Sequence, residues 1–284
     1  MLYLLKHRHD DDHDDHGGLH RDLTATASAM GRRDVLRRFA FGAGALALFG
    51  CSGEAGSGLL AGADTTIDTG SGTSTNSACS KIPSETAGPF PGDGSNGANV
   101  LNQTGVVRSD IRSSFACLSG TATGVPLAIK LTLVAASTCA PLAGRAVYLW
   151  HCDALGRYSL YTSGVTNQNY LRGVQEADAS GVVSFTSIYP GCYSGRWPHI
   201  HFEVYPTLAS SSSVSNKIAT SQIALPKAAN DVVYAQSGYG SSASNASQIT
   251  LASDGIFSDG ASLELATVTG SVSSGFVASL TVAV

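Results

Sequence analysis

A succession of short segments with the pattern of β-strands fills about the last two hundred residues of the chain. These segments alternate between apolar and polar residues or are rich in β-branched side chains, and turn-forming residues separate them. They are residues 128–134, 145–150, 181–185, 199–205, 247–251, 262–265 and 276–282. Only residues 227–236 have the composition of a short helix. Many short strands at this spacing predict an all-β fold, either an antiparallel β-sandwich or an open barrel.

The size and the charge of this region restrict its partners. About two hundred residues are enough for one domain with a sizeable hydrophobic core. The chain has 284 residues, of which 43% are hydrophobic and 13% are charged, and its formal net charge is −4. This composition does not provide the basic surface that nucleic-acid binding requires. We therefore expect small-molecule partners and no nucleic acid.

The first 51 residues have the features of an export signal. A run of histidine and aspartate between His7 and His20 is too polar to bury a core and is predicted to be disordered. The pair Arg32-Arg33 precedes an apolar run, residues 39–49, that is too short to span a bilayer as a helix. This layout predicts export by the twin-arginine route to an extracytoplasmic location.

The apolar run leads to Cys51, which ends a Leu-Phe-Gly-Cys sequence that matches a lipobox. Acylation of this cysteine would make the protein a membrane-anchored lipoprotein, whereas an ordinary cleavage site with an incidental cysteine would give a secreted protein. The residues that follow are rich in glycine, serine, threonine and alanine, as in a flexible tether. We therefore predict a signal in residues 1–51, a linker in 52–82 and one globular domain in 83–284.

Residues 199–205 carry the side chains that are best suited to bind a metal ion. In a strand, His199 and His201 point to one face, and the apolar residues between and after them point to the other face. The apolar face can pack into a sheet core while the opposite face presents two imidazoles side by side. Only three of the eight histidines lie outside the leader, and two of them form this pair. We interpret the pair as metal ligands; two polar residues on a solvated face are the alternative.

A cation and a phenol precede the histidine pair. Arg196 lies three residues before His199, and Tyr193 lies three residues before Arg196. A second segment, residues 150–159, is predicted as a strand that runs into a turn and presents Tyr158 beyond it. Tyr193 is a possible phenolate ligand. By itself, a tyrosine after a turn, such as Tyr158, is typical of a packed aromatic residue, and a surface salt bridge is the alternative for Arg196.

The chain contains six cysteines, which suits an exported protein. One of them is the candidate lipid site, and the other five could form two disulfides and leave one thiol. They are Cys79, Cys117, Cys139, Cys152 and Cys192. The sequence does not determine the pairing. A bridge between Cys152 and Cys192 would join two segments that carry candidate ligands, and buried free thiols are the alternative.

Six short motifs together resemble the intradiol ring-cleavage dioxygenases, the family of the catechol and protocatechuate dioxygenases. They are residues 86–90, 107–111, 139–144, 150–159, 172–173 and 190–201. The motifs occur in the order that the family has, and the blocks with the tyrosines and the histidine pair are the specific ones. The resemblance extends over residues 83–284 and implies the β-sandwich core of an intradiol dioxygenase.

The resemblance also implies a non-haem iron(III) centre, Fe(3+), held by two tyrosinates and two histidines. Residue by residue, these ligands are Tyr158, Tyr193, His199 and His201. The implied reaction uses O2 to cleave the ring of a catechol-type aromatic diol between its two hydroxylated carbons, which gives a muconate-type diacid. The substrate displaces one tyrosinate, assigned to Tyr158, and Arg196 stabilises negative charge that develops on the ring.

The residue types suit ferric iron, because phenolates are hard anionic donors that favour the ferric state. A zinc or ferrous site needs carboxylates or a third histidine, and the one obvious candidate is His151, which by the family pattern lies beside the site. The segment between Tyr193 and His199 is shorter than in the soluble enzymes, which predicts a more open pocket. A non-catalytic lipoprotein that binds catecholates or a polymer surface, and a zinc hydrolase, remain alternative functions.

Overall fold

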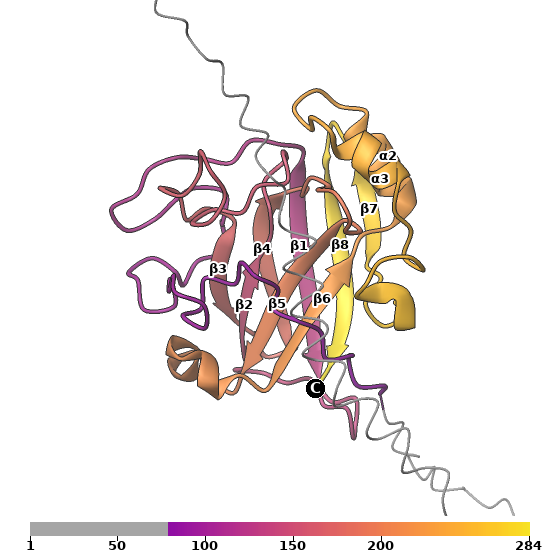
Figure 1. The fold of residues 1–284 in the computed structure, drawn as a ribbon. Coiled ribbons are helices and arrows are strands. Elements are labelled where there is room, and N and C mark those ends of the chain that lie inside the picture. Colours follow the sequence, from indigo (N-terminus) through magenta and orange to yellow (C-terminus); the bar gives the residue numbers. More distant parts are fainter. Residues whose placement is uncertain (1–78) are drawn as a thin grey trace, which may run out of the picture.

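The computed structural model describes residues 79–284, which form two four-stranded sheets that face each other (Figure 1). The first sheet has the strand order β3-β2-β5-β6, and the second has the order β4-β1-β8-β7. The strands are β1 (Pro126–Val134), β2 (Ala146–Trp150), β3 (Arg172–Glu176), β4 (Val182–Ile188), β5 (His199–Tyr205), β6 (Ala219–Ala224), β7 (Thr267–Ser271) and β8 (Gly275–Ala283). Neighbouring strands are antiparallel except β1 and β8, which are parallel. The predicted β-sandwich is confirmed.

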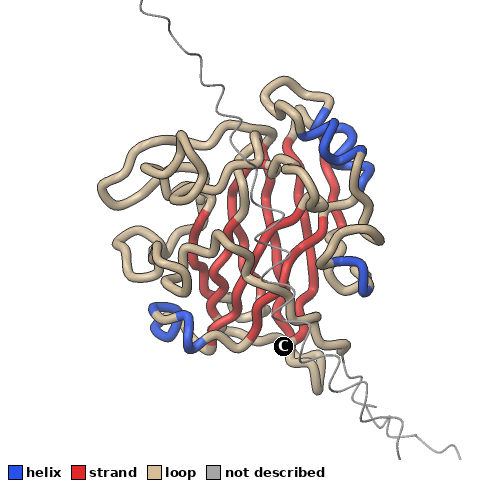
Figure 2. The backbone as a smooth tube through the Cα atoms, in the orientation of Figure 1, coloured by secondary structure: helices blue, strands red, loops and turns tan. Residues whose placement is uncertain are grey.

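Short helices lie in the connections at the periphery of the two sheets, as Figure 2 shows in blue. They are α2 (Lys227–Tyr234), α3 (Ser242–Ser247), η1 (Ala209–Ser212), η2 (Val214–Asn216) and η3 (Phe257–Asp259), where η marks a 3₁₀ helix. The helix predicted over residues 227–236 is therefore confirmed as α2. Among residues 79–284, no helix is both long enough and apolar enough to cross a membrane.

Two of the predicted strands are wrong. Residue 247 ends α3, and residues 248–251 lead into a turn in which Thr250 and Ser253 bond each other through hydroxyl and backbone groups. Residues 262–265 form a turn with a single β-bridge to β6. The sequence pattern also misses β3, β6 and β7, because these strands are short and rich in polar residues.

The main core lies between the two sheets, where alternate residues of the strands point inward. Ile129 and Leu131 of β1 belong to the same buried cluster as Phe202 of β5. A second cluster covers the outer face of the first sheet, where Trp150 packs with residues of the preceding segment such as Val100. We call this segment, residues 79–122, the N-terminal strap. It leaves all seven residues of β5 buried, and the predicted alternation of the histidine strand is confirmed.

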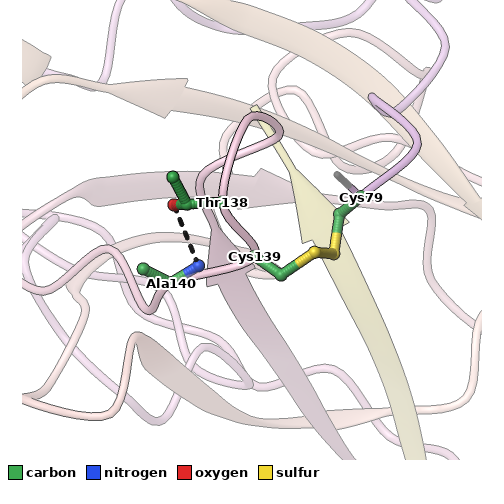
Figure 3. The surroundings of a disulfide bond; sticks show 4 residues. All are labelled: Cys79, Thr138, Cys139 and Ala140. Carbon is green, nitrogen blue, oxygen red and sulfur yellow. Dashed lines mark hydrogen bonds between the residues drawn. A yellow bond between two sulfur atoms is a disulfide. The ribbon is translucent and has the colours of Figure 1, made fainter. Parts of the chain in front are cut away.

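The cysteines differ from the expectation of two disulfides. Cys79 and Cys139 form a disulfide that closes a loop with a sequence separation of 60 residues (Figure 3). Cys117 is an exposed free thiol, and Cys152 and Cys192 are buried free thiols. The bridge considered between Cys152 and Cys192 is not formed, because the Cys152 thiol is directed to the Gly191 carbonyl at 3.4 Å. These two buried thiols therefore act as packed apolar groups.

The predictions for the leader lie outside the described residues. They concern the Arg32-Arg33 pair, Cys51 and the signal in residues 1–51. The predicted start of the globular domain at residue 83 also stays a prediction.

Candidate metal centre

Four side chains from three segments converge where β5 begins. The Nε2 atom of His199 lies 3.1 Å from Nε2 of His201, 3.2 Å from the Tyr193 hydroxyl and 3.3 Å from the Tyr158 hydroxyl. The Nη1 atom of Arg196 lies 3.5 Å from the same nitrogen. The structure therefore brings together all five residues that the sequence singled out. We call the two tyrosines and the two histidines the Tyr-His cluster.

A buried carboxylate builds the turn that places Tyr158. The Oδ1 atom of Asp153 accepts hydrogen bonds from the backbone N–H groups of Leu155 and Arg157. The Oδ2 atom accepts from the Tyr170 hydroxyl at 3.1 Å and pairs with the Arg157 guanidinium at 2.8 Å. Aspartate stabilises such turns because its carboxylate binds backbone N–H groups a few residues ahead. The turn that the sequence predicted before Tyr158 is confirmed.

Two glycines allow the segments with the two tyrosines to lie against each other. A Cβ atom at Gly191 would stand 2.5 Å from the Ala154 carbonyl oxygen. Gly156 has a φ of 80°, and its Cβ atom would stand 3.1 Å from the Cβ atom of Tyr193. A side chain at either position would separate the segments, since such contacts are closer than packed carbon atoms allow.

Different contacts orient the two imidazoles of the cluster. Nδ1 of His199 lies 2.6 Å from the Trp197 carbonyl oxygen, so this nitrogen carries the proton and Nε2 directs a lone pair into the cluster. The ring of His201 stacks on Trp150, its cross-strand neighbour, with ring centroids 5.0 Å apart and planes 4° apart. Nδ1 of His201 is buried, and the backbone of Thr86 acts on this ring by raising its pKa against the larger effect of desolvation. Stacking on Trp150 and the neighbouring strap backbone therefore both restrain this second ring.

Burial keeps both imidazoles neutral. Desolvation lowers the pKa of His199 well below 6.5, and the charge of Arg196 acts in the same direction. Desolvation also lowers the pKa of His201 well below 6.5, with His199 and Arg196 as further causes. Neutral imidazole is the form that binds metal ions. The cluster therefore presents two nitrogen lone pairs and two phenol oxygens to one point.

This donor set fits a hard cation of high charge, because a metal ion can displace the phenol protons and create two anionic oxygens. Within residues 79–284, no group of three or more histidine, cysteine, aspartate or glutamate side chains is arranged to hold a metal ion. His151 has both ring nitrogens engaged, one with the Cys152 carbonyl at 2.8 Å and one with the Ser187 hydroxyl at 2.7 Å. Burial lowers the pKa of His151 to about 4. It lies outside the cluster, as the resemblance implies.

A buried arginine connects the N-terminal strap to the segment that carries Tyr158. Arg172 is 1% exposed, and its Nε and Nη2 atoms donate to the hydroxyl and the carbonyl of Ser159 at 3.0 and 2.9 Å. The guanidinium also donates to the Phe90 and Pro91 carbonyls at 2.9 and 2.7 Å. In the sequence, Arg172 belongs only to a supporting motif of the resemblance. The structure shows that it fastens the strap to the residue after Tyr158.

The strap encloses one side of the cluster and leaves the other side more open. The ring of Phe90 packs on Tyr158 with centroids 5.0 Å apart. Gly92 follows in the strap with a φ of 66°, and a Cβ atom there would stand 2.8 Å from Arg172 Nη1. The glycine therefore lets the strap backbone lie against the Arg172 guanidinium. Tyr158 is 2% exposed, whereas Tyr193 is only partly buried. Tyr193 is therefore the more exposed of the two phenols.

Two residues that the sequence analysis did not single out contact Arg196. Asp254 pairs with its Nε atom at 3.0 Å, and Gln222 accepts a hydrogen bond from its Nη2 atom at 2.7 Å. They lie 58 and 26 residues further along the chain. Neither residue falls in a motif that the sequence analysis recognised, so no signal in the sequence identified them.

Comparisons with known proteins give one matching family model and several similar structures. A family model described as dioxygenase matches residues 109–204, a range that includes the Tyr-His cluster and Arg196. An intradiol ring-cleavage dioxygenase from Tetranychus urticae has a similar structure, with a TM-score of 0.57 and 25% sequence identity over 72% of this chain and 94% of that chain. A catechol 1,2-dioxygenase from Pseudomonas arvilla C-1 matches with a TM-score of 0.44 and 20% identity over 71% of this chain and 61% of that chain.

No curated protein matches the sequence. The resemblance to intradiol ring-cleavage dioxygenases is confirmed by the family match and by the fold that the chain shares with the Tetranychus urticae enzyme. The roles of the individual site residues stay predictions.

Proposed function

We propose that this chain, with the fold and the central segment of an intradiol ring-cleavage dioxygenase, is an iron(III) enzyme that opens the ring of a catechol-type diol. O2 supplies both oxygen atoms, the cleaved bond joins the two hydroxylated carbons, and the product is a muconate-type diacid. The observation that carries the proposal is the convergence of two phenol oxygens and the Nε2 atom of His201 within 3.3 Å of the Nε2 atom of His199. A packed or solvated role for these side chains gives no reason for such a convergence.

Tyr158, Tyr193, His199 and His201 are the residues that would hold the iron. Bound ferric iron would supply a Lewis acid that binds both diol oxygens and draws electron density from the ring. The stacked His201 and the hydrogen-bonded His199 hold their Nε2 atoms in place before any ion arrives. The buried surroundings exclude water, so nearby charges act more strongly on the reacting ring.

Arg196 contributes a positive charge next to the cluster, with Nη1 3.5 Å from His199 Nε2. A fixed guanidinium there stabilises negative charge that develops on the substrate ring during the reaction. With iron bound, one tyrosine would give up its place to the diol, and its phenolate oxygen would accept a proton from a diol hydroxyl. By the resemblance alone, this role was assigned to Tyr158. The burial of the two rings favours Tyr193, because Tyr158 is enclosed by the strap and Tyr193 lies on the more open side.

Metal content and colour test the proposal. Purified protein should hold about one iron per chain, and phenolate-to-iron charge transfer should give a broad visible band that shifts when catechol is added. A muconate-type product should accumulate with one O2 consumed per diol. A colourless protein that still binds catechol would support the non-catalytic lipoprotein instead, and zinc in place of iron would support a hydrolase.

Substitutions in the cluster separate the roles of its members. His199→Ala and His201→Ala should lose iron, because each removes one ligand from a site of four. Tyr158→Phe and Tyr193→Phe should each change the band, and the tyrosine that leaves is the one whose substitution retains more of the catechol-induced shift. Tyr161→Phe is the matched control, because this phenol bonds Asn96 and lies outside the cluster.

We also propose that the protein is exported by the twin-arginine route and anchored through Cys51. Replacement of Arg32 and Arg33 by lysine should keep the protein inside the cell, and Cys51→Ala should release the mature protein from the membrane fraction. A Cys51→Ala protein that remains with the membrane would contradict the lipid anchor. If the protein is exported as proposed, the enzyme meets its diol outside the cytoplasm.

A further inference from the structure

We propose that Asp254 is a positioning residue that fixes the direction of the Arg196 guanidinium; this inference rests on the proposed function. Arg196 is 2% exposed and Asp254 is fully buried, so water provides neither group with a partner. The Oδ2 atom of Asp254 accepts a hydrogen bond from Arg196 Nε at 3.0 Å and from the backbone N–H of Trp197 at 2.6 Å. One carboxylate oxygen therefore holds both the side chain of Arg196 and the backbone that follows it.

The other nitrogens of the guanidinium show which way it points. Nη2 donates to Gln222 at 2.7 Å, on the strand beside β5, while Nη1 lies 3.5 Å from His199 Nε2. A guanidinium is a rigid planar group, so two fixed nitrogens determine the position of the third. The contacts of Nε and Nη2 thus direct Nη1 toward the Tyr-His cluster.

Asp254 is itself held rigidly, which suits a positioning role. Its Oδ1 atom accepts from the backbone N–H groups of Ile256 and Phe257 at 2.8 and 3.2 Å. The Phe257 ring, which follows in η3, lies 5.9 Å from the guanidinium carbon of Arg196 and 6.5 Å from the His199 ring. The same short loop therefore supplies the carboxylate and an aromatic wall beside the guanidinium.

The charge of Asp254 has a further consequence for Arg196. A buried cation without a counter-ion is strongly unfavourable, and a nearby metal ion would repel it further. The carboxylate compensates the guanidinium on the side away from the cluster. Arg196 can therefore remain charged next to a site that holds another cation.

A purely structural role for Asp254 is the alternative, since its carboxylate also organises the loop through three backbone N–H groups. A double-mutant cycle with Arg196 separates the two roles. Asp254→Asn keeps the shape and one acceptor oxygen for the loop but removes the charge. Arg196→Met removes the guanidinium and keeps the length of the side chain.

The cycle measures kcat and KM with catechol as the substrate. We expect Arg196→Met to lower kcat about 100-fold and Asp254→Asn to lower it about 10-fold, since the donor of a transition-state contact is lost in one case and misdirected in the other. In the Arg196→Met background, Asp254→Asn should lower kcat by less than about twofold, because no guanidinium is left to direct. Asp231→Asn, in an exposed pair with Lys227, is the control and should leave kcat unchanged.

A readout apart from turnover accompanies the cycle. Iron content and the visible band of the resting protein should be the same in Asp254→Asn as in the wild type, and the size of the catechol-induced shift should change only when Arg196 is present. Equal losses of kcat from Asp254→Asn in both backgrounds, or a loss of iron, would overturn the positioning role and leave a structural one. A wild-type protein without iron or turnover would instead overturn the proposed function, and this inference with it.

Discussion

The outer faces of the two sheets differ in their exposure to solvent. In β1 of the second sheet, buried and exposed residues alternate, and Lys130 on the outer face is open to solvent. In β5 of the first sheet, all seven residues are buried, because the N-terminal strap covers the outer face. The second sheet thus has one dry face, whereas the first sheet has two.

This difference explains where buried polar side chains gather. A polar side chain on a solvated face is satisfied by water, but under the strap it needs a partner within the protein. Glu203 of β5 is fully buried and bonds Lys217 and the Tyr205 hydroxyl, both at 2.7 Å. Desolvation raises the pKa of Glu203, and Lys217 opposes the shift. The covered face therefore holds polar groups in fixed positions, which a metal centre requires and an open face does not provide.

The largest expected difference between the two sheets is in how much a single cation contributes to the free energy of unfolding. Arg172→Met should destabilise the protein by about 3 to 5 kcal/mol, because the carbonyls that Arg172 binds would remain buried without a donor. Lys130→Met, on the exposed face of the second sheet, should change the free energy of unfolding by less than about 0.5 kcal/mol. Urea unfolding of both variants measures this difference, and similar values would show that the strap does not seal the first sheet.

Adjacent residues should behave differently in the two sheets. Leu131→Ala should cost about 2 to 5 kcal/mol and Thr132→Ala less than about 1, because only the leucine faces the core. In β5, Phe202→Ala should cost about 3 to 5 kcal/mol, and its neighbour Glu203→Gln should still cost about 1 to 3, because the carboxylate itself and its partner Tyr205 are fully buried. Chemical denaturation checks these values. A harmless Glu203→Gln variant would contradict the idea that both faces of β5 are dry.

The disulfide tests how the second sheet is held at the end of β1. Replacement of Cys79 and Cys139 by serine should lower the free energy of unfolding by about 2 to 4 kcal/mol, because the unfolded chain loses a constraint on a long loop. Cys117→Ser, at an exposed free thiol, is the control and should have little effect. Chemical denaturation without reductant measures the free energy of unfolding of each variant. With reductant, the wild type should unfold with the same free energy as the double variant.

The smallest effect is expected from an exposed ion pair beside β4. Arg112 lowers the pKa of Asp110, mainly through its hydrogen bond, but both side chains are more than two-fifths exposed. The pair therefore contributes less than about 1 kcal/mol. Because the pKa of Asp110 is lower in the folded state, the stability that the pair contributes is fully present above the pKa of an unfolded aspartate, about 3.9. It is lost as the pH falls from there through the lower pKa of the folded state. Asp110→Asn should thus be slightly less stable than the wild type at neutral pH, with the difference vanishing in acid and in high salt.

The sequence by itself determined the features that depend on neighbouring residues. The alternation in residues 199–205 placed both histidines on one face, and the turn after β2 placed Tyr158, since side-chain direction in a strand and turn formation are local properties. The order of motifs also identified the family resemblance, which added Tyr158 to the candidate residues around the histidine strand. Local pattern failed for residues 247–251, where hydroxyl groups compete for the backbone and form a turn.

Only the tertiary structure decided which distant residues meet. It paired β1 with β8, joined Cys79 to Cys139, and placed Asp254 against Arg196. It also covered the outer face of β5, which turned a pattern that is equally typical of a solvated strand into a buried site. These outcomes depend on burial and on contacts between segments that lie tens of residues apart, and no local pattern encodes the free energy of such contacts.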